Sequence, residues 1–349
     1  MSGLICISEK ARGRRAFSKT SGDATLIKNL MFDGDRMNNP YFIIIEWSAA
    51  YECIISLYAY IYEKERKHLQ LGVSWKEETK QQLPTAFAQE LEDERWEVLH
   101  RLVLLVAQAP EKKSVADFLG WLEKLPPGEI YELLAPWVET IPLNLGEIRD
   151  HSVSLLARWN EHYFSRISPA IVTSLERSAA EMTELAGKMT AIELIDHASN
   201  GIWIEPMPDL QEVVLIPQYH CAPTSVLDFY RGLATCLYPV RDAGQTEPQP
   251  LLELLPLAQC LADEKRLHIL RCLAEKKSTL GELQEQVSLA KSTVHHHVTA
   301  LRRAGLIRAH YNGSTTIAAY SLRESFVDRL PVLLRSFLHK EEARRMTDE

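Results

Sequence analysis

TLGELQEQVSLAKSTVHHHVTALRRAGLI, residues 279–307, contains two short helical patterns joined by a three-residue turn. Thr279 and Glu282 form a capping box that begins the first helix, because the side chain of each satisfies a backbone N–H of the other. The second helix begins at Lys291 and is ended by Gly305. Two helices at this spacing form a helix-turn-helix, whose second helix enters the major groove of DNA.

The predicted recognition helix, residues 291–304, has one apolar and one polar face. At about 100° per residue, Val294, Val298 and Leu301 cluster on one side and are expected to pack on the rest of the domain. The other side is polar and basic, which suits a helix that reads base edges, and its first-turn amides favour a phosphate. The predicted DNA-binding residues of this helix are Lys291, Ser292, Thr293, His295, His296, Thr299 and Arg303.

After this helix the pattern changes from helical to alternating, in residues 306–322. Alternation with a period of two residues predicts strands, and Asn312-Gly313 is a strong signal for a two-residue hairpin turn between them. A two-stranded wing behind the recognition helix is therefore expected. Such a wing contacts the DNA backbone or the minor groove, and the residues placed to do so are Arg308, His310, Asn312 and Ser314.

Apolar helical segments flank this motif on both sides. Residues 251–261 form an apolar pattern interrupted at Pro256, and Asp263 is the expected N-cap of the next helix. Residues 326–338 repeat apolar side chains at helical spacing around Pro331, which starts or kinks that helix. The apolar side chains of both segments need a surface to pack against, and we predict that this surface is a second copy of the chain.

Four short motifs of this region occur in the order and at the spacing of a known family. They are CLADEKRLHIL at 260–270, TLGEL at 279–283, STVHHHV at 292–298 and LRRAGLI at 301–307. Together they resemble the DNA-binding domain of arsenical-resistance-repressor-type (ArsR-type) regulators, over about a fifth of the chain. The resemblance implies a winged helix-turn-helix homodimer that binds an inverted-repeat operator in double-stranded DNA, usually represses, and releases DNA when an effector binds.

The sequence departs from that family at three places. Ser288 and Ala290 stand where the family commonly has a turn glycine and a capping serine, and a missing cap costs about 0.5–2 kcal/mol. The wing tip is uncharged instead of arginine-rich, which predicts a weaker hold on phosphate. The ligand sets of the metal-sensing members are missing, and consecutive side chains at 295–297 point about 100° apart, so no metal site is expected.

The formal net charge of -8 argues against a nucleic-acid-binding protein until its distribution is considered. Residues 1–250 carry 24 Lys and Arg against 35 Asp and Glu, whereas residues 251–349 carry 15 against 12. Within residues 276–310 the balance is six basic to two acidic side chains. The positive charge is concentrated where the motif lies.

A length of 349 residues predicts more than one domain. Residues 1–39 lack periodicity and are expected to be disordered, or to be an extension upstream of a start at Met37. Residues 40–240 are the predicted N-terminal regulatory and dimerisation domain. The polar, proline-bearing segment 241–250 is the predicted linker, and residues 251–340 are the winged helix.

The N-terminal domain is predicted to be mainly helical with a small sheet, which makes the whole chain an α+β protein. The helices are expected to be bounded by proline, glycine or capping residues, and the strands by turn residues. The predicted helices are 49–65, 87–107, 114–125, 128–137, 145–159 and 170–198, and the predicted strands are 41–47, 202–204, 212–216, 225–230 and 233–240.

The remaining sequence features indicate a cytoplasmic protein without a cofactor. The cysteines are scattered without a C-x-x-C pair, which indicates reduced thiols. No signal peptide is expected, because residues 1–40 contain no sustained apolar core. No membrane span is expected either, since Glu46 and Glu52 interrupt the apolar run at 41–62. No phosphate-loop, dinucleotide-binding, zinc-protease or nucleophile-elbow motif occurs, so the chain is predicted not to be an enzyme.

Two other interpretations remain open. One is a winged helix that serves as a protein–protein module, which the total charge of -8 favours and the local positive charge opposes. The other is an N-terminal domain that senses an unknown small-molecule effector or catalyses a reaction, with DNA binding as its output. All seven tryptophans belong to that domain, where core packing is the simpler use of their rings and a ligand pocket the alternative.

Overall fold

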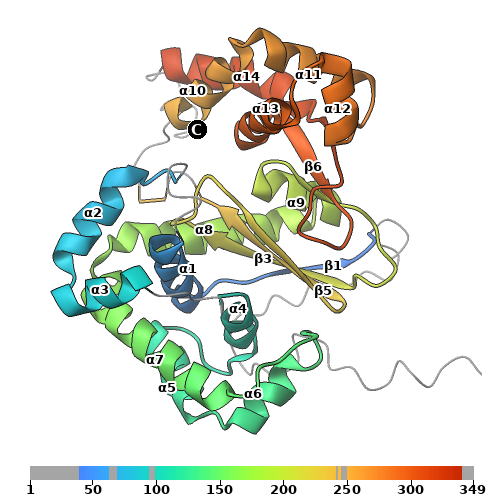
Figure 1. Cartoon of the computed structure of the whole chain (residues 1–349). Helices are drawn as coiled ribbons and strands as arrows, with labels where there is room; N and C mark the ends of the chain where they lie inside the picture. Colours follow the sequence, from blue (N-terminus) through green and yellow to red (C-terminus); the bar gives the residue numbers. More distant parts are fainter. Residues whose placement is uncertain (1–38, 63–68, 94–98, 241–242, 245–249, 340–349) are drawn as a thin grey trace, which may run out of the picture.

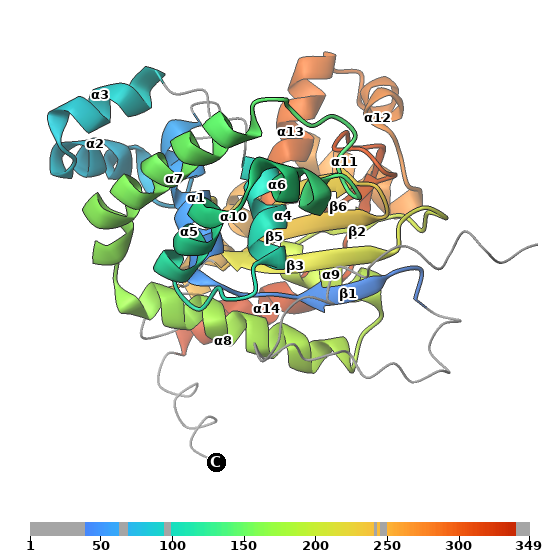
Figure 2. The ribbon, with the colours of Figure 1, turned by 90° about the horizontal axis from the view of Figure 1, so that it is seen from below.

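The chain folds around a four-stranded sheet with helices on both faces (Figures 1 and 2). The computed structural model describes residues 39–62, 69–93, 99–240, 243–244 and 250–339. The prediction that residues 1–39 are disordered or upstream of the start concerns residues outside this described part, apart from Asn39. Among the described helices, none combines the length and apolar character that crossing a bilayer requires.

The central sheet has the strand order β1-β3-β5-β4. β1, β3 and β5 are parallel, and β4 pairs antiparallel with β5 at one edge, across the tight turn at Arg231-Gly232. Parallel neighbours are joined by long crossovers, so alternation within each strand could not predict this order. The strands are β1 Phe42–Ile45, β3 Glu212–Gln218, β4 Val226–Tyr230 and β5 Leu233–Pro239.

β3 separates two hydrophobic cores. Because side chains alternate between the faces of a strand, Val214 and Ile216 join the core on one face, and Val213 and Leu215 join the core on the other. All four side chains are fully buried. A strand buried on both faces reads as a continuous apolar run, which is how residues 213–216 read.

Helices α1–α7 surround the hydrophobic core on the first face, and Figure 2 shows α4 and α6 in front of the sheet and α2 and α3 beyond its edge. Within the segment predicted as one helix at 87–107, the described residues form α3 and α4, and residues 94–98 between them lie outside the described part. α2 was not predicted. The helices are α1 Ala49–Ile61, α2 Gly72–Gln82, α3 Thr85–Asp93, α4 Leu99–Gln108, α5 Val115–Lys124, α6 Pro127–Leu134 and α7 Leu145–His162, followed by a 3-10 turn at Phe164–Arg166.

The acidic residue Glu52 lies in the apolar run after β1, and its hydrogen bonds explain how it can be buried there. Its side chain is fully buried, and its two carboxylate oxygens accept the backbone N–H of Tyr219, 3.2 Å away, while Oε1 also lies 2.5 Å from Nδ1 of His220. These bonds satisfy a buried charge that would otherwise be costly. Glu52 therefore holds the loop that follows β3.

α8 (Pro169–Ala186) and α9 (Ala191–Ser199) pack on the second face. The sequence predicted one helix over 170–198, but the chain leaves the helix after Gly187 and starts again at Thr190, whose capping box with Glu193 begins α9. This break turns the chain, so that α9 leads into a short strand against the winged helix.

The C-terminal third contains the predicted winged helix-turn-helix. Asp263 caps α11 and Thr279 caps α12, as the sequence predicted. Pro256 lies inside the continuous helix α10 rather than interrupting it, and Pro331 lies inside α14 rather than at its start. The elements are α10 Pro250–Leu261, α11 Glu264–Glu275, α12 Leu280–Val287, α13 Lys291–Arg303, β6 Ile307–Tyr311, β7 Ala319–Leu322 and α14 Ser325–Leu338.

The winged helix is joined to the N-terminal half by a shared sheet, which corrects the expected two-stranded wing. β2 (Ile202–Ile204) pairs in parallel with β6, and the strand order is β2-β6-β7. One hydrophobic core continues from α8, α9 and β3 into α11–α13. Most of the predicted linker at 241–250 lies outside the described residues, but Ala243 is buried and the N–H of Gly244 donates to Oγ of Ser174.

Candidate nucleic-acid interface

The turn between α12 and α13 is built by backbone conformation rather than by a side-chain cap. Ser288 adopts the left-handed conformation, with φ of 53°, at the position where glycine is the easier choice. Ala290 is the N-cap of α13 and has no side chain that could accept a hydrogen bond. The first-turn amides of α13 are therefore left for solvent or for a ligand such as phosphate.

α13 buries the apolar face that the sequence predicted. Val294, Val298 and Leu301 are fully buried, and they pack in the core that continues into the N-terminal half. His297, on the same side, lies with Nδ1 3.9 Å from a carboxylate oxygen of Asp263. Burial lowers the pKa of His297 below its usual value, so the ring is neutral at pH 7.

The opposite face of α13 is open to solvent along its first half. Figure 2 shows α12 and α13 on the side of the winged helix away from α14. The exposed face carries no acidic side chain in its first turn and ends in Arg302 and Arg303. Of the residues predicted to bind DNA, Lys291, Ser292, Thr293, His295 and His296 are exposed, and Thr299 and Arg303 are half-buried.

The wing tip differs from the predicted two-residue turn. β6 pairs with β7 from Ile307↔Leu322 to His310↔Ala319, so residues 312–318 form the loop between the strands. Asn312 and Ser314 lie in this loop and are exposed. Gly313 has φ of +89°, and a Cβ added there would lie 3.0 Å from Sδ of Met207, so the tip lies close to the segment after β2.

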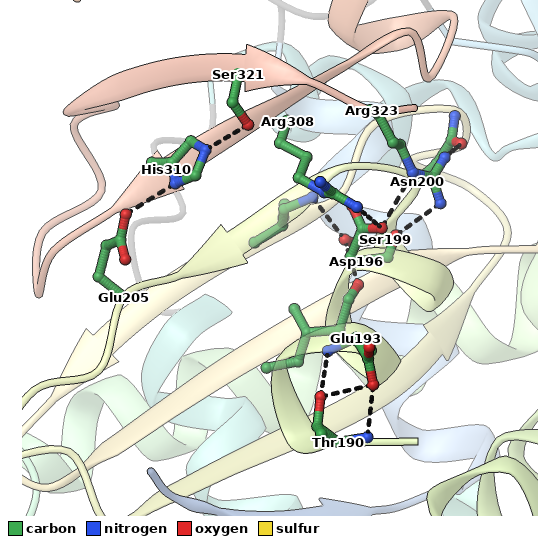
Figure 3. Close-up of polar contacts among 12 residues, drawn as sticks. Thr190, Glu193, Asp196, Ser199, Asn200, Glu205, Arg308, His310, Ser321 and Arg323 are labelled. Carbon is green, nitrogen blue, oxygen red and sulfur yellow. Dashed lines mark hydrogen bonds and ion pairs between the residues drawn. The ribbon is translucent and has the colours of Figure 1, made fainter. Parts of the chain in front are cut away.

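Arg308, predicted to contact DNA from the wing, is bonded to the N-terminal half in this structure. Its guanidinium lies against Asp196 of α9, with Nε 3.2 Å from Oδ1 and Nη2 3.4 Å from Oδ2 (Figure 3). The same group stacks over the ring of Trp203, 4.7 Å from its centroid. Arg308 therefore links β6 to α9 and β2 of the N-terminal half, and its contact with DNA stays a prediction.

His310, the second residue of β6 predicted to contact DNA, also bonds within the chain. Its ring is nearly buried, with Nδ1 2.8 Å from Oε1 of Glu205 and Nε2 2.8 Å from Oγ of Ser321 (Figure 3). Burial lowers the pKa of His310, so the ring is neutral at pH 7. Since a carboxylate only accepts, Nδ1–H donates to Glu205 and Nε2 accepts from the Ser321 hydroxyl. Lys277 pairs with the same carboxylate at 2.6 Å.

Asp196 is the centre of a polar cluster that the sequence did not reveal. Arg323, which follows β7, donates from Nε to Oδ2 of Asp196 at 3.2 Å and from Nη1 to Oδ1 of Asn200 at 2.5 Å (Figure 3). We call Asp196, Asn200, Arg308 and Arg323 the Asp196 cluster. Asp196 and Arg323 are buried. No short motif marks these residues, because they are distant in sequence and meet only through the pairing of β2 with β6.

A search of the described residues for three or more His, Cys, Asp or Glu side chains that could hold one metal ion finds no such group. The winged helix thus consists of an exposed polar helix face, an exposed loop tip and an inner strand bonded to α9. These are the parts of a DNA-binding winged helix with its wing anchored on another domain.

Comparisons with known proteins agree with this class. A helix-turn-helix domain family matches residues 261–310, from the end of α10 into β6. The transcriptional activator HlyU of Vibrio cholerae is 32% identical over 68 residues, 20% of this chain and 63% of HlyU. The HTH-type transcriptional regulator KmtR of Mycobacterium tuberculosis is 31% identical over 90 residues, 24% of this chain and 68% of KmtR.

The chain belongs to the helix-turn-helix family of transcriptional regulators. It covers slightly less than two thirds of the length of HlyU. Most of this chain, including the α1–α7 layer and the four-stranded sheet, lies outside the matched domain family. No solved structure matches the chain significantly.

Proposed function

We propose that this protein is an ArsR-type transcriptional repressor that binds an inverted-repeat operator as a homodimer, with α13 of each copy in a major groove. The exposed polar stripe on α13 is the observation that carries the proposal. In such a dimer the two recognition helices lie about 34–36 Å apart, one turn of DNA. The N-terminal half is proposed to regulate this spacing and not to catalyse a reaction.

Binding is tested by fluorescence anisotropy with duplex DNA from the region upstream of the protein's own gene. The His296→Ala variant is expected to bind about tenfold more weakly, because a base-edge contact is worth roughly 1–3 kcal/mol. The affinity of the Lys291→Ala variant should fall less steeply with salt. The negative slope of log affinity against log salt should be smaller in magnitude by about 1, because one phosphate contact is lost.

Lys124→Ala is the matched control, since Lys124 is exposed on α5, away from the winged helix. Its affinity and salt slope should equal those of the wild type. Absence of wild-type binding at low salt would contradict the proposal. A promoter–reporter fusion then shows whether the protein represses or activates transcription. This is a separate question from DNA binding, because HlyU is named an activator.

The proposed dimer surface lies on α10 and α14, which pack against each other. Phe326, Leu330 and Leu333 pack on their own chain. Other apolar side chains on these helices are exposed, and a patch of this kind is typical of an interaction surface. The exposed residues are Leu251, Leu255, Val327, Val332, Leu334, Phe337 and Leu338.

Light scattering tests this surface. The wild type is expected to have twice the chain mass of 39.8 kDa, and Phe337→Glu, which places a charge in the patch, should be monomeric. Leu143→Glu is the control, because Leu143 is fully exposed on a loop outside the patch. A monomeric wild type at tens of micromolar would contradict a stable dimer.

One observation favours the alternative of a protein–protein module. Arg308 and His310, expected on the DNA side of the wing, are bonded to Asp196 and Glu205 of the N-terminal half. A winged helix used only for protein contact would bind no DNA even at low salt, so the anisotropy measurement separates the two functions.

A further inference from the structure

A narrow cleft lies within the layer of helices α4–α7, on the face of the sheet away from the winged helix (Figure 1). Its walls are mainly leucine and isoleucine side chains, such as Leu105, Leu122, Leu134 and Ile148. The space between helices of a bundle is a common place for small-molecule sites. The cavity is small, about 30 Å³.

Ser152 is an unusual residue in this apolar cleft. Its side chain is 1% exposed and lines the cleft from α7. Its hydroxyl has no hydrogen-bond partner among the described residues, although a helical serine commonly bonds the carbonyl one turn back. A buried polar group without a partner needs an explanation, and a ligand atom that accepts its hydrogen bond is one.

Two arginines line the same cleft, and they differ in how their charge is balanced. Arg149 pairs with Asp150 at 2.7 Å and donates to the carbonyl of Leu125, also at 2.7 Å. Arg101 donates to the carbonyl of Thr140 at 3.2 Å, and no described carboxylate pairs with it. Arg101 therefore brings a half-buried positive charge to an apolar cavity, and the described part of the chain supplies no acidic partner for it.

We propose that the α4–α7 cleft binds a small monocarboxylate carried on an apolar body. The leucine and isoleucine walls contact the apolar part, Arg101 pairs with the carboxylate, and the Ser152 hydroxyl donates a hydrogen bond to the ligand. The cavity is smaller than such a ligand, so the wall side chains turn aside as it enters. The site depends on the helical layer alone and stands whether or not α13 binds DNA.

Calorimetry and thermal unfolding of the full chain test the site with hexanoate and benzoate, without DNA. Saturable binding of at least one carboxylate is expected, and 1-hexanol, benzyl alcohol and hexylamine should bind at least about fivefold more weakly. Arg101→Gln should remove this preference for the carboxylate. Ser152→Ala should weaken carboxylate binding without lowering the melting temperature of the free protein, because no protein hydrogen bond is lost.

Arg158→Gln is the matched control on α7, because Arg158 bonds to Glu90 and does not line the cleft. It should bind the carboxylates as the wild type does. The proposal is overturned if neither carboxylate binds saturably up to about 10 mM. It is also overturned if acids and alcohols bind equally, or if Arg101→Gln and Ser152→Ala leave carboxylate binding unchanged.

Discussion

Replacing Asp196 by alanine is expected to lower the free energy of unfolding by about 3–5 kcal/mol, the usual cost of removing one partner of a buried ion pair. Without Asp196 the buried guanidinium of Arg323 loses its charged partner. Burial already lowers the pKa of Arg323, and Asp196 is the group that opposes this effect. The substitution also frees Arg308 from α9. Denaturation by urea, followed by circular dichroism, measures the change.

Asp196→Asn separates charge from shape at this position. It keeps one accepting oxygen, so its loss of stability should be smaller than that of Asp196→Ala. Glu181→Ala is the control, because Glu181 forms an exposed pair with Arg177 at 3.8 Å, and such pairs contribute about 0.3–0.5 kcal/mol. Equal stabilities of Asp196→Ala and this control would show that the Asp196 cluster does not hold the two halves together.

Replacing Gly201 by alanine is expected to destabilise the protein by about 3 kcal/mol or more. Gly201 has φ of +120°, which side-chain-bearing residues rarely adopt, and an added Cβ would lie 2.7 Å from the carbonyl oxygen of Ile307. The backbone of β6 would have to move, although the Gly201 carbonyl accepts the N–H of Ala309 at 2.8 Å. Thermal and urea unfolding measure the loss.

Gly128→Ala is the control for this substitution. Gly128 lies in α6, and an added Cβ meets no atom within 4 Å. Alanine in a helix is favoured over glycine by about 0.5–1 kcal/mol, so this variant should equal or exceed the wild type in stability. If Gly201→Ala were as stable as Gly128→Ala, the prediction would be wrong, because the backbone of β6 could then move away from residue 201 at no cost in stability.

The helix-turn-helix was predictable because its signals are local. Capping residues and apolar spacing in residues 279–304 lie within a few residues of one another, and the packing of Val294, Val298 and Leu301 follows from the helical period alone. The boundaries of α11 and α12 were predictable for the same reason. The exposure of Lys291 and His296 agrees with a DNA-binding role, which stays a prediction until binding is measured.

Features that depend on distant partners were not predictable. Arg308 on an alternating strand reads as a solvent-facing residue, and only the placement of Asp196, 112 positions earlier, turns it inward. The parallel pairing of β2 with β6 leaves no local pattern in the sequence. The only sequence signal for a boundary between the winged helix and the N-terminal half was therefore the polar segment 241–250. α2 has a low mean hydropathy, which hid it from a search for apolar periodicity.

The pairing of β2 with β6 also decides what happens when the DNA-binding part is excised. A fragment that begins at residue 250 loses Ile202–Ile204 and leaves the backbone N–H and C=O groups along one side of β6 bare. Bare strand edges are templates on which other chains assemble into fibrils. We therefore expect the isolated winged helix to aggregate more readily than the full chain, in which β2 covers this edge of β6.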